Sequence, residues 1–148
     1  MNKMKLVRSE SGTSLIEFAL ILPVLVFLLL GLIEVGRYAY YAILAANAAR
    51  AGVQYGAQDV RTAEDTSGMR SAASQDAMSL ASLTANAQYL CSQNGSPPAP
   101  CASGVPGSGN VYYVKVQVTG TFSSLLSYPG IPTHIPVSGS AIMRVISQ

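Results

Sequence analysis

This chain of 148 residues has few charged side chains. Asp, Glu, Lys and Arg make up 11% of it, against roughly 25% in an average soluble protein. The formal net charge of +2 is fully accounted for by residues 1–12, where three cations and Glu10 sum to +2 and leave zero for the rest of the chain. The sequence therefore lacks both the basic surface that binds nucleic acid and an acidic tail, and we expect no nucleic-acid partner.

Residues that commonly carry catalysis are also scarce. The single histidine, His134, lies in a proline-rich stretch without a nearby acid or cysteine, so we expect it to be a solvated loop residue. The sequence contains no Gly-x-Ser-x-Gly element, no paired-histidine helix motif and no Cys-x-x-Cys. We therefore predict no enzymatic activity, no metal site and no cofactor.

One long apolar run stands out from this background. Residues 15–33 contain a single charge, Glu17, and residues 18–33 contain none. A bilayer span requires about 20 mostly apolar residues, and Lys3, Lys5 and Arg8 before the run favour a cytoplasmic N-terminus. We expect a single-pass protein of a bacterial inner membrane with the remainder of the chain outside the cytoplasm. The residues expected in the membrane helix include Leu15, Ile16, Leu20, Leu22, Pro23, Leu25, Phe27, Leu29 and Leu32.

A secretory signal peptide is the competing interpretation of this run. Its apolar region is about 7–15 residues long and ends at a small-x-small cleavage site. The run here is longer and is followed by Glu34-Val-Gly-Arg37, while a good small-x-small triplet comes later, at Ala46-Asn47-Ala48. These features favour a retained span over a protein released by signal peptidase.

Glu17 requires a physical reason, because a charge at the centre of a bilayer costs about 2.5–3.5 kcal/mol even on the lenient insertion scale. One interpretation is an acid that reaches the membrane interface. The other requires a cut between Gly12 and Thr13, which gives Thr13 a new positive amine one helical turn from Glu17. The acid then suits the positive end of the helix dipole and is placed to pair with the amine of a neighbouring subunit, which sets the register of an assembly.

The run Gly12-Thr13-Ser14-Leu15-Ile16-Glu17-Phe18 resembles the prepilin peptidase site of type IVb pilins: a glycine, four residues, a glutamate and an aromatic residue. Residues 11–57 resemble more specifically the TadE-like proteins of tight-adherence (Tad/Flp) pilus systems. The similarity extends through Gly31-Leu-Ile-Glu-Val-Gly-Arg-Tyr38 and Asn47-Ala-Ala-Arg-Ala-Gly-Val-Gln-Tyr55, and returns at Gly139-Ser-Ala-Ile-Met-Arg144.

The resemblance implies a minor pilin or pseudopilin that takes part in a pilus for adhesion, biofilm formation or secretion. It implies as partners a prepilin peptidase, other pilins, an inner-membrane assembly platform and the lipid bilayer. The expected parts are a leader (residues 1–12), a transmembrane and extended helix (residues 13–57) and an extracytoplasmic α+β domain (residues 58–148). The alternative is an uncleaved, membrane-anchored scaffold of an envelope complex.

The remainder predicts a small α+β unit on the continued helix. Alanines and glycines from Ala45 to Gly56 suit close packing, although the alternative is simply the high helix propensity of alanine. Residues 59–67 are expected to be a connector with a loose capping box at Thr62 and Asp65, and residues 68–90 a second helix. Residues 91–110 are expected to be an exposed loop.

Strands are predicted at residues 111–122, with the valines at 114, 116 and 118 on one face, and at residues 137–146, with 137, 139, 141, 143 and 145 on one face. The two cysteines, Cys91 and Cys101, are expected to form a disulfide in an oxidising compartment, the alternative being two free thiols. Tyr38, Tyr40 and Tyr41 are expected where the helix leaves the lipid.

Overall fold

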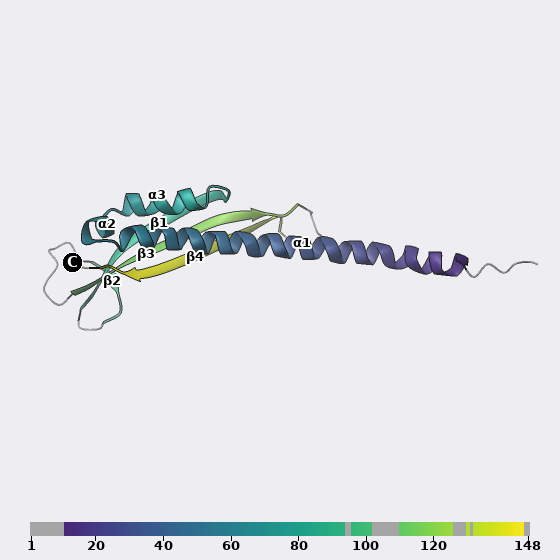
Figure 1. Ribbon diagram of the computed structural model, residues 1–148, viewed down its shortest axis with the longest axis horizontal. Coiled ribbons are helices and arrows are strands. Elements are labelled where there is room, and N and C mark those ends of the chain that lie inside the picture. The colour runs from purple at the N-terminus through teal and green to yellow at the C-terminus, as the bar shows by residue number, and fades with distance from the viewer. Residues whose placement is uncertain (1–10, 94–95, 102–109, 126–129, 131, 147–148) are drawn as a thin grey trace, which may run out of the picture. The chain divides into compact units, whose positions relative to one another are not determined.

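The computed structural model describes residues 11–93, 96–101, 110–125, 130 and 132–146 (Figure 1). The chain divides into two compact units, Met1–Gly36 and Arg37–Gln148. The predicted α+β class is confirmed, as is the predicted end of the long helix near Ala57. The elements in chain order are helices α1 (Ser11–Gly56), α2 (Val60–Glu64) and α3 (Thr66–Asp76), followed by strands β1 (Ala81–Gln93), β2 (Ala99–Pro100), β3 (Asn110–Ser123) and β4 (His134–Arg144).

The described part of the first unit is the beginning of α1. The helix is continuous through Pro23, where the missing N–H removes one backbone hydrogen bond. By length and composition, α1 is able to cross a membrane.

The second unit contains a four-stranded antiparallel sheet in the order β2-β1-β3-β4. In β3, Val114, Val116 and Val118 are buried, while Gln117 and Thr119 on the other face are exposed. The predicted alternation of this strand is therefore confirmed. The register places Lys115 opposite Gln88 of β1 and opposite Ile142 of β4.

Residues 37–56 of α1 and helix α3 cover one face of this sheet (Figure 1). Because the helices come close to the strands, the core between the two layers consists mostly of alanine and valine, together with Met69, Leu80, Tyr112 and Phe122. Met69 of α3, Val53 of α1 and Val116 of β3 are fully buried in it. Alternating apolar residues on the strands thus meet the small side chains of the helices across a thin core.

The predicted helix over residues 68–90 is wrong in its second half. Helix α3 ends at Asp76, and residues 81–93 form β1, the long strand that pairs with β3. On the face that a helix over residues 68–90 would turn inward, Met69, Ala73, Ala77 and Leu80 are buried, but Thr84 is exposed. The helix therefore stops about four turns early, and Ser82, at φ 53, lies where the chain turns into the strand.

Several shorter predictions also need correction. The connector at 59–67 contains α2, whose capping box is formed by Asp59 and Thr62 and not by Thr62 and Asp65. The expected loop at 91–110 holds the end of β1, strand β2 and the start of β3, while residues 94–95 and 102–109 lie outside the described residues. The last strand begins earlier than expected, so His134 is the first residue of β4 and not a loop residue. Met143, which was expected on the same face as the buried Val137, is 39% exposed.

Candidate functional site

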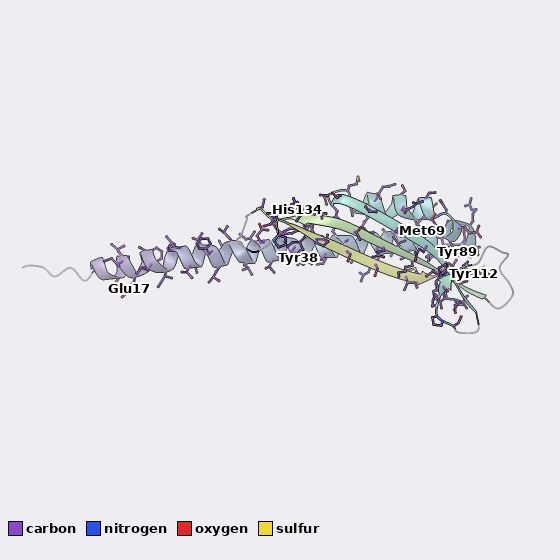
Figure 2. All side chains as sticks on the ribbon, turned by 180° about the vertical axis from the view of Figure 1, so that it is seen from behind. Glu17, Tyr38, Met69, Tyr89, Tyr112 and His134 are labelled. Carbon is purple, nitrogen blue, oxygen red and sulfur yellow. A yellow bond between two sulfur atoms is a disulfide. The ribbon has the colours of Figure 1, made fainter. Side chains whose placement is uncertain are left out.

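The predicted cleavage junction lies at the start of α1. Ser11 is the first helical residue, so the Gly12–Thr13 bond is in the first helical turn. Glu17 follows one turn later and is exposed (Figure 2). Within the described part of the chain Glu17 makes no hydrogen bond or ion pair. Its carboxylate is therefore available to a partner outside this chain.

Large apolar side chains surround α1 after Glu17. Phe18 is 61% exposed and Leu22 42% exposed, and the residues between them are also apolar. The predicted membrane residues share this exposure, while their contact with lipid remains a prediction. They are Leu15, Ile16, Leu20, Leu22, Pro23, Leu25, Phe27, Leu29 and Leu32.

The second half of α1 has the opposite character. Ala45, Ala48 and Ala49 are fully buried. A Cβ atom added to Gly52 would lie 2.9 Å from the carbonyl oxygen of Met69 and 3.0 Å from Cγ1 of Val116. The predicted close packing of this segment is thus confirmed, with α3 and β3 as its neighbours.

The strand β4 approaches the same helix even more closely. A Cβ atom added to Gly139 would collide with the backbone of Ala45 and Ala46. Backbone atoms cannot rotate away as the tip of a side chain can, so glycine is the residue that fits at this contact. Gly139 belongs to the C-terminal motif that resembles the TadE-like proteins, and this contact gives that motif a structural role.

An aromatic cluster closes the end of the second unit at which Arg37 lies. The rings of Tyr38 and Tyr41 pack edge to face on Phe122 with centroid distances of 5.8 and 5.5 Å. The guanidinium of Arg37 lies 5.2 Å from the centroid of the same ring, a cation–π distance. Sequence reasoning identified the tyrosines but missed Phe122, because no local pattern joins residues so distant in the chain.

The corner between α1 and α3 is fixed by hydrogen bonds to Asp65. Its carboxylate caps α3 by accepting from the N–H of Gly68 at 2.8 Å, and it also accepts from the hydroxyl of Tyr55 at 2.9 Å. A further hydrogen bond from the Ser67 hydroxyl is the largest of the causes that lower the pKa of Asp65 to about 2. The hydrogen bond between the Tyr55 hydroxyl and the Asp65 carboxylate raises the pKa of Tyr55.

The disulfide lies at the end of the sheet away from Arg37 (Figure 1). Cys91 of β1 and Cys101 after β2 are bonded, with 5.1 Å between their Cα atoms, as the sequence predicts. Beside them the rings of Tyr89 and Tyr112 stack at 5.6 Å (Figure 2). Burial raises the pKa of Tyr89 to about 12. Both hydroxyls are buried without a hydrogen-bond partner among the described residues.

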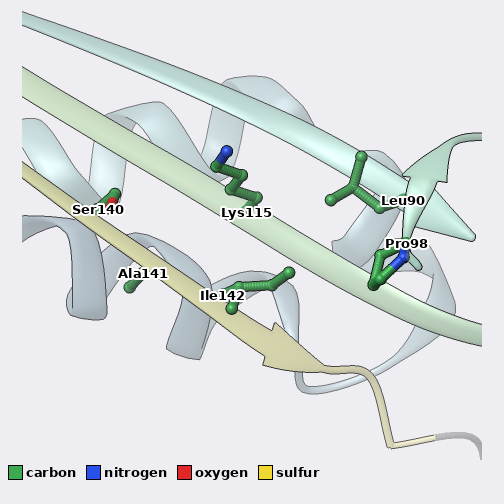
Figure 3. A pocket seen from close by; sticks show the side chains of 6 residues that line it. All are labelled: Leu90, Pro98, Lys115, Ser140, Ala141 and Ile142. Atoms are coloured by element: carbon green, nitrogen blue, oxygen red, sulfur yellow. The ribbon is translucent and has the colours of Figure 1, made fainter.

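A hollow of about 270 Å³ lies on the outer face of the sheet (Figure 3). Lys115 is its one charged residue, and its other lining side chains are apolar or, at Ser140, small and polar. Such a lining offers no pair of titratable groups for acid–base catalysis. The lining residues are Leu90, Pro98, Lys115, Ser140, Ala141 and Ile142.

Metal-binding clusters are also missing from the described residues: nowhere do three or more His, Cys, Asp or Glu side chains gather. His134, the residue that catalysis would most often use, is exposed and interacts with the hydroxyl of Ser123 at 3.3 Å.

Comparison with known proteins supports the resemblance seen in the sequence. The family model of the TadE-like proteins matches residues 12–54. The matched segment begins at the predicted cleavage junction and includes the exposed apolar half of α1 and nearly all of its small-residue half. It is consistent with a TadE-like protein of Tad pilus systems. Searches of the curated proteins and of the solved structures gave no match.

Proposed function

We propose that this chain is a non-enzymatic minor pilin or pseudopilin of a Tad/Flp-type pilus system. The observation that carries the proposal is the order of features along one helix. A Gly12-to-Glu17 junction opens an exposed apolar helix, and the same helix then becomes the packed spine of a folded unit. The TadE-like match covers this transition.

In this proposal a prepilin peptidase hydrolyses the bond between Gly12 and Thr13 on the cytoplasmic side of the inner membrane. Hydrolysis removes the cationic leader with Lys3, Lys5 and Arg8 and leaves a protonated α-amine on Thr13. Glu17 is four residues further along, so the amine and the carboxylate of one chain lie about one helical turn apart. Pairing with the amine of a sister subunit offsets the cost of the acid in lipid and fixes the axial register.

The same helix explains how a subunit moves from lipid into an assembly. Large side chains such as Leu20, Leu25 and Phe27 are 71%, 57% and 66% exposed. In the bilayer they contact acyl chains, and in a bundle they contact the same side chains of neighbouring subunits. Because both surroundings are apolar, extraction requires little change in the solvation of this surface.

Topology and redox chemistry agree with this placement. A cytoplasmic leader places the second unit across the inner membrane, where thiols are oxidised. The bonded pair Cys91–Cys101 is in that unit. The assembly platform and other pilins are the partners that this function requires.

The first test is the N-terminus of the chain in cells with and without the prepilin peptidase, measured by mass spectrometry. We expect the mature chain to start at Thr13 when the peptidase is present and at Met1 when it is absent. Gly12→Leu is expected to block the cut, with Ser11→Ala as the control that leaves it intact. A mature chain that retains Met1 while pili form normally would instead support the uncleaved scaffold.

The second test separates insertion from assembly. Glu17→Ala is expected to leave membrane insertion intact and to reduce incorporation into pili or pilus assembly, because only the pairing of subunits loses its anion. Glu34→Ala, a change at the other end of the apolar segment, is the control. Normal piliation in Glu17→Ala would remove Glu17 from the mechanism.

A further inference from the structure

The end of the second unit at which Arg37 lies exposes an unusual set of apolar side chains. Leu125 is 72% exposed, Tyr40 59% and Tyr38 39%. These residues come from two places in the chain, the start of the unit on α1 and the residues that follow β3. They are exposed although the unit has a well-packed core nearby.

Contacts within the unit place these residues at the same end. Tyr38 packs on Phe122 at 5.8 Å, and β3 ends one residue later, at Ser123. The N–H of Ser124 donates to the carbonyl oxygen of Thr133 at 2.9 Å, which joins the two ends of the connection between β3 and β4. Leu125 directly follows Ser124 and therefore lies close to this hydrogen bond. Figure 2 places Tyr38 and His134 at this same end of the sheet.

The distribution of charge distinguishes the two ends of the unit. From Val116 to Met143 the sequence contains no Asp, Glu, Lys or Arg, so the part of β3 after Lys115, its connection to β4 and β4 as far as Met143 carry none of these charged side chains. The turn between α3 and β1 lies at the end of the unit where Arg37 lies, and in it Met78 is 83% exposed. The acid nearest to this turn in sequence is Asp76, the last residue of α3. The charged groups of the α1–α2–α3 corner are instead at the other end: Asp59, Arg61, Glu64 and Asp65.

We propose that this end of the unit, formed by Arg37, Tyr38, Tyr40, Phe122 and Leu125, rests in the headgroup layer of the bilayer that α1 enters. The inference depends on the proposed function in requiring residues 15–33 to span the membrane. Arg37 is four residues beyond Ile33, so the chain itself brings this end to the lipid surface.

The side chains have the chemistry of a membrane interface. Tyrosine rings favour that layer, where an apolar body and a polar hydroxyl meet lipid and water at once. A guanidinium close to the surface is attracted by the negative charge of anionic lipids. Leu125 gains by leaving water for the acyl boundary. Phe122 is buried and contacts both Tyr38 and Arg37, so it holds these two side chains at this end of the unit.

The test uses the full chain in vesicles of phosphatidylethanolamine and phosphatidylglycerol. A fluorescent label is attached to Leu125→Cys or, as the matched control, to Ile146→Cys, with Cys91 and Cys101 left in their disulfide. Ile146 is an equally simple aliphatic residue, 62% exposed, whose N–H bonds the carbonyl of Ala57 at the other end of the unit. A lipid with a nitroxide on its headgroup is the quencher.

We expect quenching at position 125 to be at least about threefold stronger than at position 146, because the 20 helical residues between Arg37 and Ala57 separate the ends by about 30 Å. Equal quenching at the two positions overturns the inference. A label at Leu25→Cys, read with a nitroxide on the acyl chain, distinguishes the causes of failure. If position 25 is quenched and position 125 is not, the interface contact alone is wrong. If position 25 is not quenched, membrane anchoring fails and the inference fails with it.

Discussion

The two halves of α1 use one helix for two different surroundings. Residues 14–36 carry large apolar side chains that are mostly exposed, whereas residues 37–56 carry a stripe of alanine and glycine that is mostly buried. Charges at Glu34 and Arg37 mark the end of the uncharged run, but they do not account for the burial of the second half. The size of the side chain separates them. The long side chains are the ones proposed to contact lipid, whereas the small ones allow a sheet to reach the helix backbone.

The largest effect that tests this comparison comes from enlarging a glycine in each half. Gly52→Leu is expected to destabilise the second unit by about 3 kcal/mol, because the added atoms meet the carbonyl of Met69 and the side chain of Val116. Gly31→Leu is the matched control, since a Cβ atom there meets nothing within 4 Å. The measurement is chemical denaturation of the full chain in detergent, followed by the near-ultraviolet circular dichroism of the tyrosines. Similar denaturation midpoints for the two variants would contradict the distinction between the halves.

A somewhat smaller effect is expected from the disulfide, which is in the second unit. Replacing Cys91 and Cys101 by serine removes the cross-link of a short loop, and loop-closure entropy gives a loss of about 2–3 kcal/mol. Membrane insertion of the first half of α1 is expected to remain unchanged. The comparison is made between oxidised wild type and the double variant, with the reduced wild type as a control that must match the variant. A double variant as stable as the oxidised protein would show that the bridge is not a stabilising element.

A third test addresses the aromatic cluster at the boundary between the halves. Phe122→Leu keeps an apolar side chain but removes two edge-to-face contacts with Tyr38 and Tyr41 and the cation–π contact with Arg37. We expect a loss of about 1–2 kcal/mol in the denaturation experiment. Ile142→Leu, on the exposed face of the sheet, is the control that leaves stability unchanged. Equal stability of the two variants would mean that the cluster is held by the fold and contributes nothing to it.

The smallest effect is a dependence on acid at the corner that turns the chain back from α1. Hydrogen bonds from Ser67, Gly68 and Tyr55 lower the folded-state pKa of Asp65 to about 2, below the ordinary value of 3.8. Their stabilisation is fully present above 3.8 and is lost as pH falls towards 2. We therefore expect the thermal midpoint to fall over this range in the wild type, and to fall less in Asp65→Asn. Asp76→Asn is the control with the wild-type slope, and an unchanged slope in Asp65→Asn would contradict the assignment.

The sequence was sufficient to predict the long helix, the strand at β3 and the disulfide. Each of these depends on a local pattern: an uncharged run, a strict alternation of Val114, Val116 and Val118, or a pair of cysteines across a glycine- and proline-rich stretch. The match to the TadE-like model over residues 12–54 likewise rests on a local motif. The cleavage at Gly12 and the role of Glu17 stay predictions, because they concern other molecules.

Strand β1 was predicted wrongly because its composition favours a helix. Alanine at positions 81, 85 and 87 has high helix propensity, and no glycine or proline marks the turn before it. The alternation was nevertheless present, with Ala85 and Ala87 half-buried and Asn86 and Gln88 exposed. Pairing along β3 decides the outcome, since a strand of small residues is stable when a long neighbour supplies its hydrogen bonds. That neighbour comes later in the sequence and is not visible to local reasoning.

The contact between Gly139 and the backbone of Ala45 also bears on the order of events during synthesis. The ribosome completes α1 well before β4, the last strand of the described chain. Under the proposed topology, the small-residue side of the helix has no cover and the sheet lacks an edge until the segment around Gly139 has crossed the membrane. Late closure of this kind depends on contacts distant in sequence, which form slowly. In that proposal, the newly inserted chain has a period in which it is anchored but incomplete, and periplasmic chaperones or proteases have access to it then.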